Sequence, residues 1–237
     1  MAQVSSTQNG VRNVVLVHGA FAEGSSWAKV IPLLQAKGLH VTSVAIPLTS
    51  FEEDVAATKR AITVQDGPVI LVGHSYGGVV ITEAGNDPKV VGLVYVAAFA
   101  PDVGQSIVDI STGFPKPPGM DELRPQPDGF LLLSERGVEE DFAQDLTADE
   151  KKLLTALQPM TAGAIFGAKP SAAAWRNRPV WYVVSDKDRM IAPDQEKSMA
   201  QRLKAKITVL PSSHVAMLSH PREVAQVIAE ASAGASS

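Results

Sequence analysis

The segment VILVGHSYGGVV, residues 69–80, limits the possible folds of this chain more than any other stretch of the sequence. Its first four residues are apolar and favour a buried strand, and the residues after Ser75 have the composition of a helix. Gly73 and Gly77 lie two residues before and after Ser75, and glycine allows a sharp turn with close packing. The segment therefore predicts a strand that turns abruptly into a helix and carries a hydroxyl group at the bend.

Strand-like and helix-like segments alternate on both sides of this bend. Further strands are predicted at residues 11–20, 40–46, 90–99, 178–188 and 206–213. Helices are predicted at residues 24–38, 51–65, 75–85, 192–203 and 221–233. Near-continuous runs of Val, Ile and Leu in the strands are typical of a parallel sheet with both faces covered. The pattern predicts one α/β domain over residues 1–237, with a mostly parallel sheet flanked by helices.

The alternation stops between about residues 101 and 170. This stretch contains the proline-rich segments FPKPPG and RPQPDG, followed by helical patterns such as GVEEDFAQDL and ADEKKLLTALQPM. Strand-like runs are scarce in it. We therefore expect a mostly helical lid inserted into the domain, and not a separate second domain.

The composition excludes several classes of partner. The formal net charge of −4 offers no basic surface for nucleic acid or anionic lipid. The chain has no cysteine, so disulfides, thiolate metal sites and a cysteine nucleophile are all excluded. The polar N-terminal residues lack the apolar region of a signal peptide, and no apolar run is long enough to span a bilayer. We expect a cytoplasmic protein; the sequence makes no prediction of its oligomeric state.

Polar residues capable of catalysis follow three of the predicted strands. They are Ser75, Asp188 with Asp186 close by, and His214. In a parallel α/β sheet, ligands bind at the carboxyl ends of the strands, where these residues are expected. A serine hydroxyl becomes a good nucleophile when a base takes its proton and a third group orients that base. The sequence thus predicts Ser75 as nucleophile, His214 as base and one of the two aspartates as the orienting acid.

The segment GHSYG also fits the G-x-S-x-G nucleophile elbow of α/β-hydrolases, with the partners in the chain order Ser, Asp, His. The helix that follows Ser75 points its N-terminus at developing negative charge, and the Tyr76 N–H is a donor for an oxyanion. A second donor is expected from the HGAF segment after the first strand. The candidates there are the N–H of Ala20 and, as an alternative, that of Phe21. This chemistry needs no metal and no organic cofactor.

The chain as a whole resembles the α/β-hydrolase superfamily. The segments LVHGAF, GHSYGG, DRMIAP and SHVAMLSHP match most closely the branch of plant methylesterases, hydroxynitrile lyases and small bacterial esterases. In that branch the acid is the aspartate that begins a D-x-x-I-x-P run. The sequence has this run as DRMIAP, which begins at Asp188. The resemblance favours Asp188, and Asp186 stays the alternative.

The resemblance implies an esterase that acts on small to medium carboxylic esters, with a small-molecule ester as its partner. Plant-type hydroxynitrile lyases are the first alternative, but they carry a threonine at the position of Gly19 and a lysine at that of Val215. The second alternative is a ligand-binding receptor on a hydrolase scaffold. For the substrate pocket we consider four apolar side chains, with a plain core role as the competing interpretation: Phe21, Phe99, Phe130 and Met217.

Overall fold

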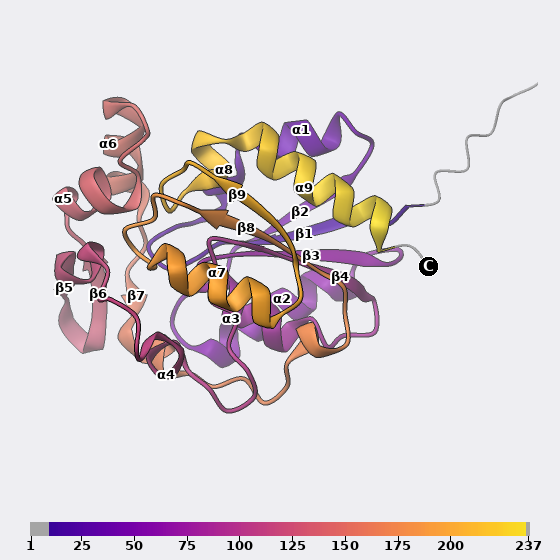
Figure 1. Cartoon of the computed structure of the whole chain (residues 1–237), viewed down its shortest axis with the longest axis horizontal. Helices are drawn as coiled ribbons and strands as arrows, with labels where there is room; N and C mark the ends of the chain where they lie inside the picture. The colour runs from indigo at the N-terminus through magenta and orange to yellow at the C-terminus, as the bar shows by residue number, and fades with distance from the viewer. Residues whose placement is uncertain (1–9, 236–237) are drawn as a thin grey trace, which may run out of the picture.

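Helices cover both faces of a central sheet in a computed structural model of the chain, which describes residues 10–235 (Figure 1). The polar residues 1–9, on which the expectation of no signal peptide largely rests, lie outside the described residues. Within residues 10–235, no helix combines the length and apolar character needed to cross a membrane.

The central sheet has six strands in the order β2-β1-β3-β4-β8-β9. Every pairing between neighbouring strands is parallel. The strands are β1 (Asn13–Val17), β2 (His40–Val44), β3 (Val69–His74), β4 (Val90–Val96), β8 (Val180–Ser185) and β9 (Lys206–Leu210). The predicted α/β architecture is therefore confirmed, and the inner strands β1, β3 and β8 are buried along their whole length.

Helices cover the central sheet in two layers. One face of the sheet is covered by α1 (Ile31–Gln35) and α9 (Pro221–Gly234), and the other by α2 (Phe51–Thr63), α3 (Gly77–Ala84) and α7 (Pro193–Arg202) (Figure 1). The predicted helix at 24–38 is divided into η1 (Gly24–Trp27) and α1. Pro32 explains the division, because proline has no N–H for a bond to the preceding turn and fits only in the first turn of a helix.

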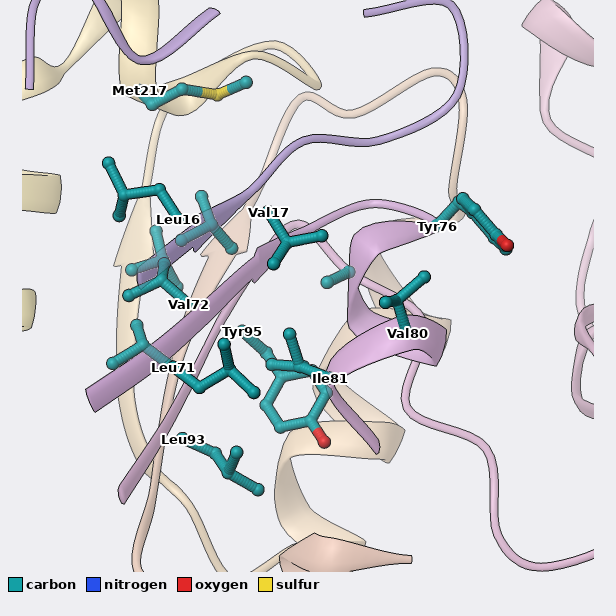
Figure 2. Packing of buried hydrophobic residues seen from close by; sticks show 14 of the residues in the cluster. Leu16, Val17, Leu71, Val72, Tyr76, Val80, Ile81, Leu93, Tyr95 and Met217 are labelled. Atoms are coloured by element: carbon teal, nitrogen blue, oxygen red, sulfur yellow. The ribbon is translucent and has the colours of Figure 1, made fainter. Parts of the chain in front are cut away.

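Apolar side chains from the strands interdigitate with those of both helical layers (Figure 2). Leu16 and Val72 are register partners on β1 and β3, and they point to the same side as Met217 of the short helix α8 (Ala216–Ser219). On the other side, Leu71 faces Ile81 of α3. All five side chains are completely buried. This packing holds β3 and α3 in place on either side of Ser75.

Residues 101–170, between β4 and β8, form an insert at the carboxyl ends of the central strands, on the left in Figure 1. Its helical elements are α4 (Ile107–Ser111), η2 (Pro118–Glu122), η3 (Pro127–Gly129), α5 (Glu135–Gly137), η4 (Val138–Phe142), α6 (Ala148–Leu157) and η5 (Gly163–Gly167). A further short helix, η6 (Ala174–Arg176), lies outside the insert, beside Gly85 at the C-terminal end of α3. The insert also has an antiparallel sheet of β5 (Leu123–Pro125), β6 (Phe130–Leu133) and β7 (Thr161–Ala162). These strands have two to four residues, too few to produce a recognisable alternation in the sequence.

Gly78 gives a direct test of the packing around α3. A Cβ atom at this position would overlap Phe99 O, an atom of the backbone after β4. We predict that Gly78→Ala lowers the free energy of unfolding by about 1–3 kcal/mol, despite the better helix propensity of alanine. Gly167→Ala is the control, because a Cβ there has no neighbour within 4 Å. Urea unfolding measures both variants, and equal stability would contradict the packing described.

Candidate active site

The backbone of Ser75 lies in the left-handed region, with a φ of 53°. This conformation is uncommon for residues other than glycine and persists where surrounding contacts enforce it. Ser75 N donates to Val96 O, and Ser75 O accepts from Phe99 N at 3.1 Å. A Cβ atom at Gly73 would come within 2.6 Å of Gly77 O, so the two glycines of the motif meet across the bend. The bend is therefore packed too tightly for larger residues at these two positions.

The loop after β1 packs directly against this bend. A Cβ atom at Gly19 would lie 2.7 Å from Ser75 Cβ. His18 holds the loop, because its Nδ1 donates to Gly19 O at 2.9 Å and its Nε2 accepts from Ile46 N at 3.2 Å. Burial lowers the pKa of His18, which keeps the ring neutral and suited to both roles. The HGAF segment thus lies beside the serine.

Two backbone N–H groups near Ser75 are free to bind a ligand. Across residues 10–235, no hydrogen bond uses the N–H of Ala20 or that of Tyr76. The N–H of Phe21, in contrast, donates to Thr161 Oγ1 of β7 at 3.1 Å. Buried N–H groups rarely stay unpaired. The N–H groups of Ala20 and Tyr76 are therefore better placed than that of Phe21 to donate a hydrogen bond to a substrate. The alternative donor, Phe21, is already engaged by the insert.

His214 and Asp188 form a buried pair. His214 Nδ1 lies 2.6 Å from Asp188 Oδ2, and both side chains are almost completely inaccessible to solvent. The other carboxylate oxygen of Asp188 accepts from the N–H groups of Met190 at 2.7 Å and Ile191 at 2.9 Å. Asp186 points elsewhere: its side chain is 50% exposed and lies 3.6 Å from Lys197 Nζ. The structure brings Asp188, and not Asp186, to His214.

His74 joins the loop of His214 to the bend at Ser75. His74 Nε2 donates to His214 O at 2.8 Å, and the two ring centroids are 4.7 Å apart. Burial holds the pKa of His74 well below its usual value, so the ring is a neutral structural donor. In the described part of the chain no hydrogen bond connects Ser75 Oγ with the His214 ring. Such bonds commonly tighten only when substrate is bound.

The insert braces the same loops from outside. Arg189 Nε, next to Asp188, lies 2.6 Å from Asp141 Oδ1. The N–H of Ser213, next to His214, donates to Asp145 Oδ2 at 2.8 Å. The insert therefore contacts both of the loops that carry the Asp188–His214 pair.

An apolar cavity of about 440 Å³ lies between the insert and the central domain. Phe99, whose N–H bonds to Ser75 O, forms part of its wall, and so does Phe166, which stacks on Phe21 at 6.3 Å. Three of the four predicted pocket residues do not line this cavity: Phe21, Phe130 and Met217. Phe130 lies on β6 opposite Ala162, and Met217 is completely buried in the core. Of the four predicted side chains, Phe99 lines the cavity and Phe21 supports its wall.

A family model described as the alpha/beta hydrolase family matches residues 14–227. The chain belongs to this family. Its relatives include Probable hydrolase R7 of Phoma sp., 26% identical with 92% of this chain and 96% of that one covered. Methylesterase 2 of Arabidopsis thaliana is 32% identical over 43% of this chain and 44% of its own. The fold also matches the crystal structure of a pyrethroid hydrolase from Sphingobium faniae, with a TM-score of 0.81, 23% identity and coverage of 93% and 96%.

Membership of the alpha/beta hydrolase family confirms the resemblance inferred from the four sequence segments. It also agrees with the predicted fold and with the prediction of a hydrolase.

Two polar side chains near the site of this hydrolase were not recognised in the sequence, Thr161 and Asp54. Thr161 lies in a strand of two residues and has no motif around it. Asp54 lies within the charged segment FEEDVAATKR, yet it is completely buried. Its spacing of four from Thr58 and eight from Ile62, both buried too, is the signal that places it on the inner face of α2.

Asp54 connects α2 with the bend at Ser75 through Tyr76. Its Oδ2 accepts from the Tyr76 hydroxyl at 2.7 Å, and its Oδ1 accepts from Leu48 N at 2.8 Å. Burial raises the pKa of Asp54 from 3.8 to about 6, although both hydrogen bonds oppose the shift. Asp54 thus binds a proton more tightly in the folded protein than in the unfolded chain.

This shift predicts a pH dependence of stability that Asp54→Asn removes. The contribution of Asp54 is greatest below pH 3.8 and declines as the pH rises through about 6, because the folded state resists ionisation of the carboxyl. Between pH 4 and 7, the free energy of unfolding of the wild type should fall by about 2 kcal/mol relative to the variant. Denaturant unfolding at a series of pH values measures the difference. Parallel pH curves for the two proteins would contradict the prediction.

Proposed function

We propose that this chain is a serine hydrolase that cleaves small to medium carboxylic esters through an acyl-enzyme intermediate. The observation that carries the proposal is the buried hydrogen bond between His214 Nδ1 and Asp188 Oδ2, on a loop joined by His74 to the bend at Ser75. An aspartate in this position selects the tautomer in which Nε2 of the histidine is a base. A relative named as a methylesterase supports the choice of an ester as substrate.

Acylation begins when His214 Nε2 takes the proton of Ser75 Oγ and the oxygen attacks the ester carbonyl. Asp188 orients the imidazole and stabilises its cation, and it keeps its own negative charge throughout. The carbonyl oxygen becomes an oxyanion, for which the N–H groups of Ala20 and Tyr76 are the donors. Removal of one such donor typically costs about 3 kcal/mol of transition-state stabilisation.

The tetrahedral intermediate then breaks its bond to the alkoxy oxygen, and His214 gives its proton to the leaving alcohol. The acyl group stays on Ser75 Oγ. Water enters, loses a proton to His214 and attacks the acyl carbon. The tetrahedral intermediate then breaks its bond to Ser75 Oγ, which takes the proton back from His214 as the carboxylic acid is released. All of these reaction steps use only water and the side chains and backbone groups of this chain.

The apolar cavity walled in part by Phe99 supports a substrate of modest size. Its volume of about 440 Å³ lies in the range of sites for small organic molecules. Phe99 and Phe166 line it, so an apolar acyl or alkyl group fits better than a charged one. In this proposal the insert, residues 101–170, is the lid of a single domain and shapes the pocket for that group.

The structure around Gly19 favours hydrolysis over cyanohydrin cleavage. A Cβ atom at this position would lie only 2.7 Å from Ser75 Cβ and 3.0 Å from His74 O, so a threonine could not be accommodated without movement of the loop. Val215, at the position of the lyase lysine, is completely buried. Both features agree with an esterase.

Ser75→Ala tests the nucleophile. With p-nitrophenyl esters of increasing chain length, the wild type should hydrolyse the short and medium esters. The variant should lose about 10³-fold or more in kcat, because the acyl group has no acceptor. Ser171→Ala is the control, since this exposed serine bonds to Glu83 near the C-terminal end of α3, the end of the helix opposite Ser75. A Ser75→Ala variant with near wild-type turnover would refute the mechanism, and a wild type that turns over no ester would favour the receptor alternative.

The pair Asp188→Asn and Asp186→Asn tests the acid. Asparagine at 188 presents an amide that favours the wrong tautomer of His214, so kcat should fall by about 10⁴-fold. Asparagine at 186 changes a half-exposed side chain and should leave kcat within a few-fold of the wild type. Steady-state kinetics on one ester compares the two variants. The opposite ranking would identify Asp186 as the acid.

A further inference from the structure

A second carboxyl group lies behind Asp188 and has no part in the mechanism described so far. Glu196, on α7, is completely buried. Its Oε2 accepts from the N–H of Ser185 at 2.9 Å, and the carbonyl of Ser185 accepts from the N–H of Asp188 at 3.2 Å. Both acidic residues are thus anchored to the same residue at the end of β8, and their carboxyl groups lie within hydrogen-bonding reach of each other.

The second oxygen of Glu196 has an unusual environment. Oε1 is buried, and no hydrogen-bond donor among the described residues reaches it. A buried carboxylate oxygen without a donor is costly, whereas a protonated oxygen beside a carboxylate is itself a donor. The Asp188 carboxylate can accept about four hydrogen bonds, of which His214, Met190 and Ile191 supply three. A proton on Glu196 Oε1 would supply the fourth.

The surrounding charges decide which of the two carboxyls holds the proton. The Asp188 carboxylate and the Tyr182 hydroxyl interact electrostatically with Glu196, and so does the cation of Lys197 on the same helix. Burial and the charge of Asp188 hold the pKa of Glu196 well above its usual range, and Lys197 offsets only part of this. Asp188, with three N–H donors, is the better stabilised anion.

We propose that Glu196 is a positioning residue for the acid of the triad, a neutral carboxyl that donates a hydrogen bond from Oε1 to the Asp188 carboxylate while Oε2 accepts from Ser185 N–H. This inference rests on the proposed function of Ser75, His214 and Asp188. Glu196 holds the Asp188 carboxylate in its orientation toward His214 and adds no second negative charge beside it.

Infrared spectroscopy tests the protonation state directly. The difference spectrum between the wild type and Glu196→Gln at pH 7 should contain the C=O stretching band of a buried carboxylic acid, which a carboxylate lacks. The same band should persist in Asp54→Asn, which removes the other buried carboxyl with a raised pKa. A difference spectrum with carboxylate bands only would overturn the proposal.

Kinetics separates the hydrogen bond from the packing of Glu196. In Glu196→Gln the amide can donate to Asp188 and accept from Ser185, so kcat should stay within about three-fold of the wild type. Glu196→Met has a similar length and no donor, so kcat should fall about 10-fold with KM unchanged. Equal kcat values for the two variants would overturn the positioning role. If Glu196→Met does not fold, the infrared result on Glu196→Gln decides.

The two experiments distinguish this inference from the proposed function. An enzyme that hydrolyses esters but lacks the carboxylic acid band retains the triad and refutes the role of Glu196. A protein that has the band but hydrolyses no ester refutes the triad, while Glu196 still holds the proton.

Discussion

The left-handed backbone of Ser75 is the constraint on which the rest of the site depends. It exists because β3 and α3 meet at an angle that brings Gly73 against Gly77, and because Gly19 passes against the serine itself. Any Cβ at these three positions would come within 2.7 Å of a neighbouring atom, which includes backbone at two of them. The same close packing holds the HGAF segment, which contains Ala20, against the bend that carries Ser75 and Tyr76.

Burial changes the pKa values of several titratable groups around this bend. His18 and His74 are neutral because burial lowers the pKa of each, and they serve as donors and acceptors that hold loops together. Asp188 accepts from three N–H groups, whereas burial raises the pKa of Asp54 to about 6.

The sequence was sufficient for the architecture and for the order of the candidate site along the chain. Runs of Val, Ile and Leu predict the strands because both faces of the sheet are buried, and GHSYG predicts the bend because only small residues fit there. The resemblance favoured Asp188 over Asp186 because of the DRMIAP segment. In the structure, the turn after Asp188 returns two N–H groups to its carboxylate. The predictions of cytoplasmic location and of a single domain with a lid stay predictions.

The rest depends on contacts between segments that are distant in the chain. Thr161 reaches Phe21 across 140 residues, and neither position has a local pattern that reveals the contact. Asp54 and Glu196 lie in charged helices that resemble solvent-exposed surfaces, so their burial becomes evident only when the helices are docked. Phe21, Phe130 and Met217 do not line the observed cavity, because the tertiary fold decides which apolar side chains face it. The choice of substrate pocket stays a prediction.

The central claim is that Ser75 is the nucleophile, and covalent labelling tests it most directly. The wild-type protein is treated with a fluorophosphonate, digested and analysed by peptide mass spectrometry. One label per chain, on Ser75, with none on Ser75→Ala, is the expected result. A label on a different residue of the wild type, or no label at all, would contradict the account.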